Sequence, residues 1–266
     1  KIPAIFDILG QRGLRSKILN LPNTYPARTI HGMLVSGFVA HDLSRAVHPP
    51  FLAPVLRAQG YVLEAETDRA VQHPRELLQG LHTSLQARLR AFDMLFKDRD
   101  FDFFCFVITE TDRLFHFLFP AVEDETHPLH PECSEFLDQL DKTVAHVLDR
   151  FNELPEPKRI MAVADHGFTK LVTEFDLNAW LQQAGLLRLS RPAANAYDFD
   201  AISPETAALA MDPGRIYLHT AQRFGRGRLT DAEARRTAEE ITSGLMQLRH
   251  EGEPILEKIW TREELY

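Results

Sequence analysis

Short apolar runs alternate with longer amphipathic stretches along this chain, and this alternation constrains the fold more than any other feature. Each apolar run is the length of a strand. In the amphipathic stretches apolar residues recur every three or four positions, as they do on a helix with one buried face. Strands that alternate with helices form a mostly parallel sheet covered by helices, so the pattern predicts an α/β protein.

The strongest segments can be assigned one by one. The predicted strands cover residues 15–21, 101–108, 159–164 and 215–218, and the predicted helices cover residues 74–96, 131–151, 174–184 and 231–248. Residues 32–38, between two glycines, are interpreted as extended chain or loop. The aromatic run 101–108 is interpreted as a central strand buried on both faces, and with the next helix and strand it forms a βαβ unit.

The pattern of apolar residues becomes less regular near residue 190. Residues 191–203 are poor in periodic apolar positions, and only a short strand and one helix follow. We therefore predict an α/β core over residues 1–190 and a less regular peripheral or cap region over residues 191–266.

Composition excludes several classes of protein. The chain has 38 acidic and 30 basic side chains and a net charge of −8, which argues against a protein that binds a nucleic-acid polymer. No apolar run reaches the roughly 18 residues that a membrane span needs, so no membrane partner is expected. The two cysteines form no disulfide framework. They predict one buried and one surface thiol in a reducing compartment, and hence a cytoplasmic location.

Two pairs of a carboxylate and a histidine follow the two most distinct strands. Asp112 and His116 are four residues apart, so one helical turn would place both on one face. Asp165 and His166 are adjacent and converge only on a bent loop, which Gly167 permits. Open α/β sheets bind their ligands at the carboxyl ends of strands, so the two pairs could form one site.

Nitrogen and oxygen ligands of this kind suit Zn²⁺, Mn²⁺ or Fe better than Ca²⁺. Two such ions about 4 Å apart are a common device for phosphoryl transfer. The alternatives are a surface or capping pair for Asp112 and His116, and a strand-end turn for Asp165 and His166. Arg113, between the first two, is expected to form a structural ion pair.

These segments resemble those of a known family. The segment 112–116 is similar to the D-R-x-x-H motif, and 164–168 to the S-D-H-G-F motif, of the type I phosphodiesterase and nucleotide pyrophosphatase family in the alkaline phosphatase superfamily. Weaker similarities follow in the same order along nearly the whole chain, at residues 21–27, 32–38, 177–186 and 216–218. His219 stands where the family's I-Y-L-N motif has Asn.

The resemblance implies an alkaline-phosphatase-like fold, a three-layer αβα sandwich, and hydrolysis of small anionic phosphoesters. It also implies two divalent metal ions, most often zinc. By motif, Asp165 and His166 would bind the ion that also holds the nucleophile, and Asp112 and His116 would bind the second ion. In such enzymes a Thr or Ser oxygen attacks phosphorus, and water then cleaves the phospho-enzyme.

Two parts of the family pattern have no counterpart in these residues. They are the segment with the Thr or Ser nucleophile and a third histidine ligand of the second ion. We therefore expect that the chain is part of a longer enzyme, inactive by itself and weak in metal binding. Thr24 and Tyr25 are candidates for lining the substrate pocket, although a turn role before Pro26 is the simpler interpretation of Thr24.

Other functions stay open. A sulfatase, a phosphonate hydrolase or a phosphoglycerate-mutase-like enzyme of the same superfamily would use the same metal pairs. A non-catalytic relative would instead act as a binding module.

Overall fold

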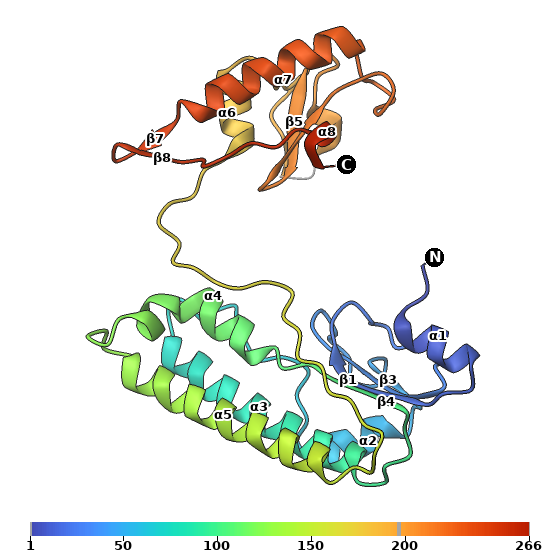
Figure 1. Cartoon of the computed structure of the whole chain (residues 1–266). Coiled ribbons are helices and arrows are strands. Elements are labelled where there is room, and N and C mark those ends of the chain that lie inside the picture. The colour runs from blue at the N-terminus through green and yellow to red at the C-terminus, as the bar shows by residue number, and fades with distance from the viewer. Residues whose placement is uncertain (1, 196–197, 266) are drawn as a thin grey trace. The chain divides into compact units, whose positions relative to one another are not determined.

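The computed structural model of the chain describes residues 2–195 and 198–265. The chain divides into two compact units, Lys1–Lys170 and Leu171–Tyr266 (Figure 1). The division therefore precedes residue 190, where the sequence predicts the end of the α/β core. That the first unit is a catalytic core and the second a peripheral region stays a prediction.

The first unit contains a four-stranded sheet. Its strands are β1 (Ser16–Leu21), β2 (Gly32–Ser36), β3 (Val47–His48) and β4 (Phe103–Phe106). They lie in the order β3-β2-β1-β4. β1 is parallel to β2 and β4, and only the short β3 is antiparallel to its neighbour. The prediction of a mixed α/β protein with a mostly parallel sheet is confirmed.

The two faces of this sheet are covered by different helices. Ile18 and Leu34 pair in register on one face and pack with Phe6 of helix α1 (Ile5–Gln11). Leu19 and Val35, one position further along each strand, point to the opposite face, because side chains alternate along a strand. There they pack with the helices α2 (Leu52–Ala58) and α3 (Pro74–Phe96). Helices thus cover both faces, as in a three-layer αβα sandwich.

Two further helices pack on α3, namely α4 (Glu110–Glu123) and α5 (His130–Asn152) (Figure 1). Leucines spaced at helical intervals on α3, such as Leu78, Leu81 and Leu85, form the shared core. The predicted helices 74–96 and 131–151 are confirmed. α4 is kinked at Leu118 and contains Pro120, which cannot donate a helical hydrogen bond.

Two strand predictions are wrong. β4 is an edge strand rather than a central one, and its side chains are half-buried. Residues 159–164 form no strand, and Met161 and Val163 are 84% and 80% exposed. Apolar and β-branched residues indicate strand propensity, but a strand also needs a hydrogen-bonded neighbour, and propensity does not reveal that neighbour.

The second unit has its own core. Helices α6 (Leu177–Gln183) and α7 (Asp231–Met246) pack with the antiparallel strands β5 (Ala208–Asp212) and β6 (Arg215–Leu218). Its shorter elements are η1 (Phe199–Ala201), β7 (Arg249–His250), β8 (Glu253–Pro254) and α8 (Arg262–Leu265). Among the described residues, no helix has the length and apolar character that crossing a membrane requires.

Candidate functional site

The first predicted pair lies on α4, which begins directly after β4. Only two residues separate the end of β4 from Thr109, the residue before the helix, so the first turn of α4 lies at the carboxyl edge of the sheet. Asp112 and His116 are one turn apart on this helix, and Asp112 Oδ1 lies 3.4 Å from His116 Nε2. The expected placement on one face of a helix is thus observed.

The second pair lies on an extended loop that reaches the first. His166 Nε2 is 3.8 Å from Asp112 Oδ1 and 3.7 Å from Asp165 Oδ2. Gly167 follows, and a Cβ atom built there would meet no other atom within 4 Å. A side chain would therefore fit at position 167, so close approach does not require this glycine. All four predicted residues lie in one cluster.

Phe168 packs among the side chains of this cluster. The centroid of its ring lies 5.0 Å from that of His116, 5.2 Å from that of His166 and 5.3 Å from that of Phe115. The two histidine contacts are edge-on, the geometry that aromatic rings favour. Phe168 is part of the D-H-G-F segment, but the sequence did not identify it as a site residue.

The four side chains offer the donor types that zinc prefers, two imidazole nitrogens and two carboxylates. They are accessible, from 34% exposed at Asp112 to 91% at Asp165. Each histidine nitrogen faces a carboxylate oxygen, however, rather than a point shared by several donors. Within the described ranges, no group of three or more His, Cys, Asp and Glu side chains is arranged to hold a metal ion. The donor types fit a divalent metal ion, and how they would be divided between two ions stays a prediction.

Arg113 lies between the two residues of the first pair in the sequence and forms ion pairs with its neighbours. Its side chain is 13% exposed and pairs with Glu64 at 3.4 Å and with Asp112 at 3.4 Å. The guanidinium carbon also lies 4.1 Å from the centre of the Phe38 ring, within cation–π distance. The ion pair expected for Arg113 is confirmed, and it fixes this cation beside Asp112.

Thr24 and Tyr25 follow β1 at the same edge of the sheet but have other partners. The Thr24 hydroxyl donates a hydrogen bond of 2.7 Å to the Leu21 carbonyl, as a turn residue does. The Tyr25 ring packs on His41, with 4.8 Å between centroids, and below the Arg45 guanidinium. No contact joins Thr24 or Tyr25 to the four-residue cluster in the described part of the chain, so a role in the pocket stays a prediction.

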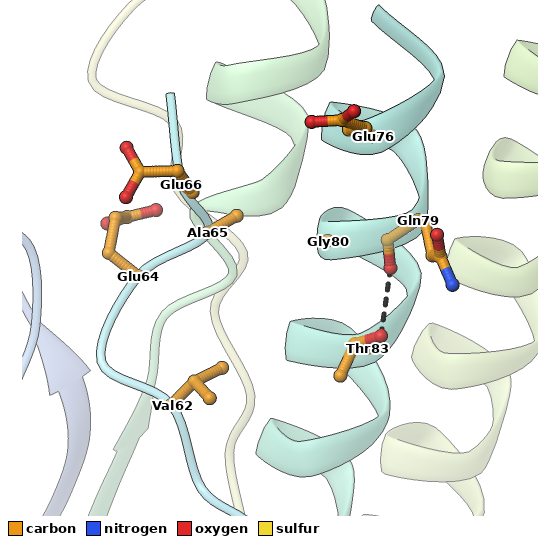
Figure 2. A pocket seen from close by; sticks show the side chains of 8 residues that line it. All are labelled: Val62, Glu64, Ala65, Glu66, Glu76, Gln79, Gly80 and Thr83. Atoms are coloured by element: carbon orange, nitrogen blue, oxygen red, sulfur yellow. Dashed lines mark hydrogen bonds between the residues drawn. The ribbon is translucent and has the colours of Figure 1, made fainter. Parts of the chain in front are cut away.

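A cavity of about 320 Å³ lies nearby, between α3 and the segment that leads to it (Figure 2). Glu64 and Glu66 line it on the segment, and Glu76 lines it on the helix. Burial raises the pKa of the Glu64 carboxyl, although Arg113 and Arg88 lower it. A cavity with three carboxylates repels anions, so we do not assign it to an anionic substrate.

One comparison with known proteins identifies a family. The family model described as type I phosphodiesterase / nucleotide pyrophosphatase matches residues 2–266. No curated protein and no solved structure matches the chain.

Proposed function

The chain belongs to the type I phosphodiesterase / nucleotide pyrophosphatase family. We propose that it belongs to a metal-dependent hydrolase whose substrates are small anionic phosphoesters. The observation that carries the proposal is the contact between His166 and Asp112, at 3.8 Å. It joins the two segments in which the chemistry-bearing residues of the chain are concentrated. A coincidental surface pair does not explain why both segments meet at the carboxyl edge of the sheet.

We assign two divalent metal ions to the cluster, zinc in the first place and manganese or iron as alternatives. Asp112 and His116 would hold one ion, and Asp165 and His166 the other. Bound there, the ions would supply positive charge for a phosphoryl group that becomes more negative as it reacts. We do not assign Thr24 as the nucleophile, because its hydroxyl donates to the Leu21 carbonyl.

The other residues of the site position these side chains. Phe168 packs against both histidine rings and restricts their orientation. Arg113 pairs with Glu64 and Asp112 and so holds Asp112 in place. The positive charge that attracts an anionic substrate would come from the bound metal ions, because the chain as a whole carries a net charge of −8.

The test is hydrolysis of bis-p-nitrophenyl phosphate by the full-length protein, compared with p-nitrophenyl phosphate, with zinc or manganese and after removal of metal by EDTA. We expect metal-dependent hydrolysis of the diester. Asp165→Ala should lower the rate by at least about 100-fold, because the metals contribute several kcal/mol to stabilising the transition state.

Asp141→Ala, at an exposed position on α5, is the matched control and should leave the rate unchanged. An Asp165→Ala variant with the wild-type rate would show that the site is misassigned. Hydrolysis of p-nitrophenyl sulfate in place of the phosphodiester would favour a sulfatase. No turnover of any of these esters would favour a binding module.

A further inference from the structure

A buried ion pair lies beneath the start of α4. Arg88 of α3 is 0% exposed, and Glu110, the first residue of α4, is 1% exposed. The Arg88 Nε atom donates a hydrogen bond to the Glu110 carboxylate. Glu110 precedes Asp112 by two residues, so this pair lies at the base of the helical turn that carries the candidate site.

The remaining donors of Arg88 tie two other segments to the same point. Its guanidinium donates to the Tyr61 hydroxyl at 3.0 Å and to the Leu63 carbonyl at 3.0 Å. It also donates to Thr109 Oγ1 at 3.3 Å. A planar guanidinium with five N–H donors suits such a network, because it can bind several acceptors in a fixed geometry.

Asn20, near the end of β1, also binds the residue that precedes α4. Asn20 Nδ2 donates to Thr109 Oγ1 at 3.2 Å and to the Val107 carbonyl at 2.9 Å. Thr109, the residue that precedes α4, is therefore held both from α3 and from β1. Arg113 adds a further tie, since it pairs with Glu64 in the segment that also contains Tyr61 and Leu63.

The buried charges of this network cost free energy that an apolar core would not. Burying an ion pair costs desolvation free energy, and apolar residues of similar volume often stabilise a protein equally well or better. Glu110 Oε2 and Asn20 Oδ1 are buried without a hydrogen-bond partner among the described residues. The network is better explained by the orientation that it imposes than by the stability it provides.

We propose that Arg88 and Glu110 are positioning residues, which fix where α4 begins and thereby hold Asp112 and His116 in the orientation that the candidate metal site requires. The proposal rests on the proposed function for the identity of that site. Arg88 and Glu110 themselves are not metal ligands in this proposal.

The test compares variants of the full-length protein. Arg88→Met leaves Glu110 buried and unpaired, so it should lower the melting temperature strongly. The double variant Arg88→Met/Glu110→Met removes both charges and should recover most of that loss. Arg90→Met, at an exposed arginine two positions along α3 that hydrogen-bonds the Gln59 carbonyl, is the control.

Three measurements separate positioning from stability. In the double variant, we expect about 10- to 100-fold weaker zinc binding in competition with a chelating dye, the usual effect of losing an outer partner of a metal ligand. We expect kcat to fall by a similar factor with little change in KM. We also expect faster hydrogen exchange at the amides of residues 109–116. A double variant that recovers its melting temperature and keeps wild-type zinc affinity and exchange would overturn the proposal.

Arg88→Lys provides a second test, even if the double variant does not fold. Lysine keeps the charge beside Glu110 but cannot bind Tyr61, Leu63 and Thr109 in the same fork. Zinc affinity should fall and exchange at residues 109–116 should rise, and wild-type values for both would contradict the proposal. The exchange measurement needs no turnover. If the wild type neither binds zinc nor hydrolyses esters, the proposed function fails, but faster exchange in these variants would still support positioning.

Discussion

His166 and Asp112 show how the site depends on single side chains. The loop that carries His166 has neither helical nor strand hydrogen bonds, so its position beside α4 rests on side-chain contacts. Phe168 provides the apolar part of these contacts, against Phe115 and His116. Loops held by few contacts are the least stable parts of a fold, and each such contact therefore has a large effect on the site.

Phe168→Ala tests this dependence. Removal of the ring frees both histidines to rotate, so we expect zinc affinity to fall by about 10-fold, as for other supporting residues of metal sites. The melting temperature should change little, since the loop is exposed. Isothermal titration with zinc checks the prediction. Phe51→Ala, at a phenylalanine that is 57% exposed, is the control, and an equal loss in both variants would exclude a specific role for Phe168.

The two cysteines differ from the expectation. One buried and one surface thiol were expected, but Cys133 is buried and Cys105 is half-buried. α5 explains the burial, because Cys133 lies on the face that packs with Phe136 in the shared core. Burial raises the pKa of the Cys133 thiol to about 11.

The raised pKa predicts how Cys133 responds to pH. The folded state holds the thiol proton more tightly than the unfolded state, so this contribution to stability is complete below the ordinary pKa of 9.0 and is lost as the pH rises toward 11. At pH 8 the folded Cys105→Ser variant should hardly react with Ellman's reagent, while the unfolded chain should react fully. Rapid reaction of the folded variant would show that Cys133 is accessible.

At the scale of secondary structure, the sequence predicts helices better than the pairing of strands. Helices α3 and α5 were predicted because their apolar residues repeat within the segment itself. The approach of Asp112 and His116 followed from their spacing on one helix. The edge position of β4 and the unpaired residues 159–164 were missed, because strand neighbours come from distant parts of the chain. The same reason hides the pair formed by Arg88 and Glu110, which no periodic pattern connects.

The ends of β1 and β2 approach each other so closely that only glycine fits. A Cβ atom at Gly37 would lie 2.2 Å from the Asn20 carbonyl oxygen. Gly37→Ala should therefore displace the end of β1 and destabilise the protein by about 1–3 kcal/mol, the usual cost of overpacking. Urea unfolding measures this change.

Gly80→Ala is a matched control within the same unit. A Cβ atom there would lie 3.6 Å from Ala65 Cβ, an ordinary contact, and alanine favours a helix interior by about 1 kcal/mol over glycine. We expect the opposite sign, a gain in stability. Equal effects of the two substitutions would contradict the close approach at Gly37.

At the scale of the whole molecule, the chain has two cores joined through a long segment. Between the end of α5 and the start of α6, residues 153–176 contain no helix or strand, and Arg159 and Lys170 are exposed. Exposed chain without regular structure is the preferred substrate of proteases. This segment also contains Asp165 and His166, so the candidate site draws half of its donors from it.

Limited digestion with trypsin should therefore cut first at Arg159 or Lys170 and leave two stable fragments, identified by mass spectrometry. If the segment orders when it binds metal, zinc should slow these cuts. First cuts within α3 or α7 would contradict the division into two units.

The central claim is that Asp112, His116, Asp165 and His166 form one metal site. Anomalous scattering at the zinc absorption edge, from crystals of the full-length protein with zinc, tests it most directly. We predict two peaks about 4 Å apart, one within about 2.2 Å of donor atoms of Asp112 and His116 and the other equally close to Asp165 and His166. Zinc peaks elsewhere in the protein, with none at these four side chains, would contradict the claim.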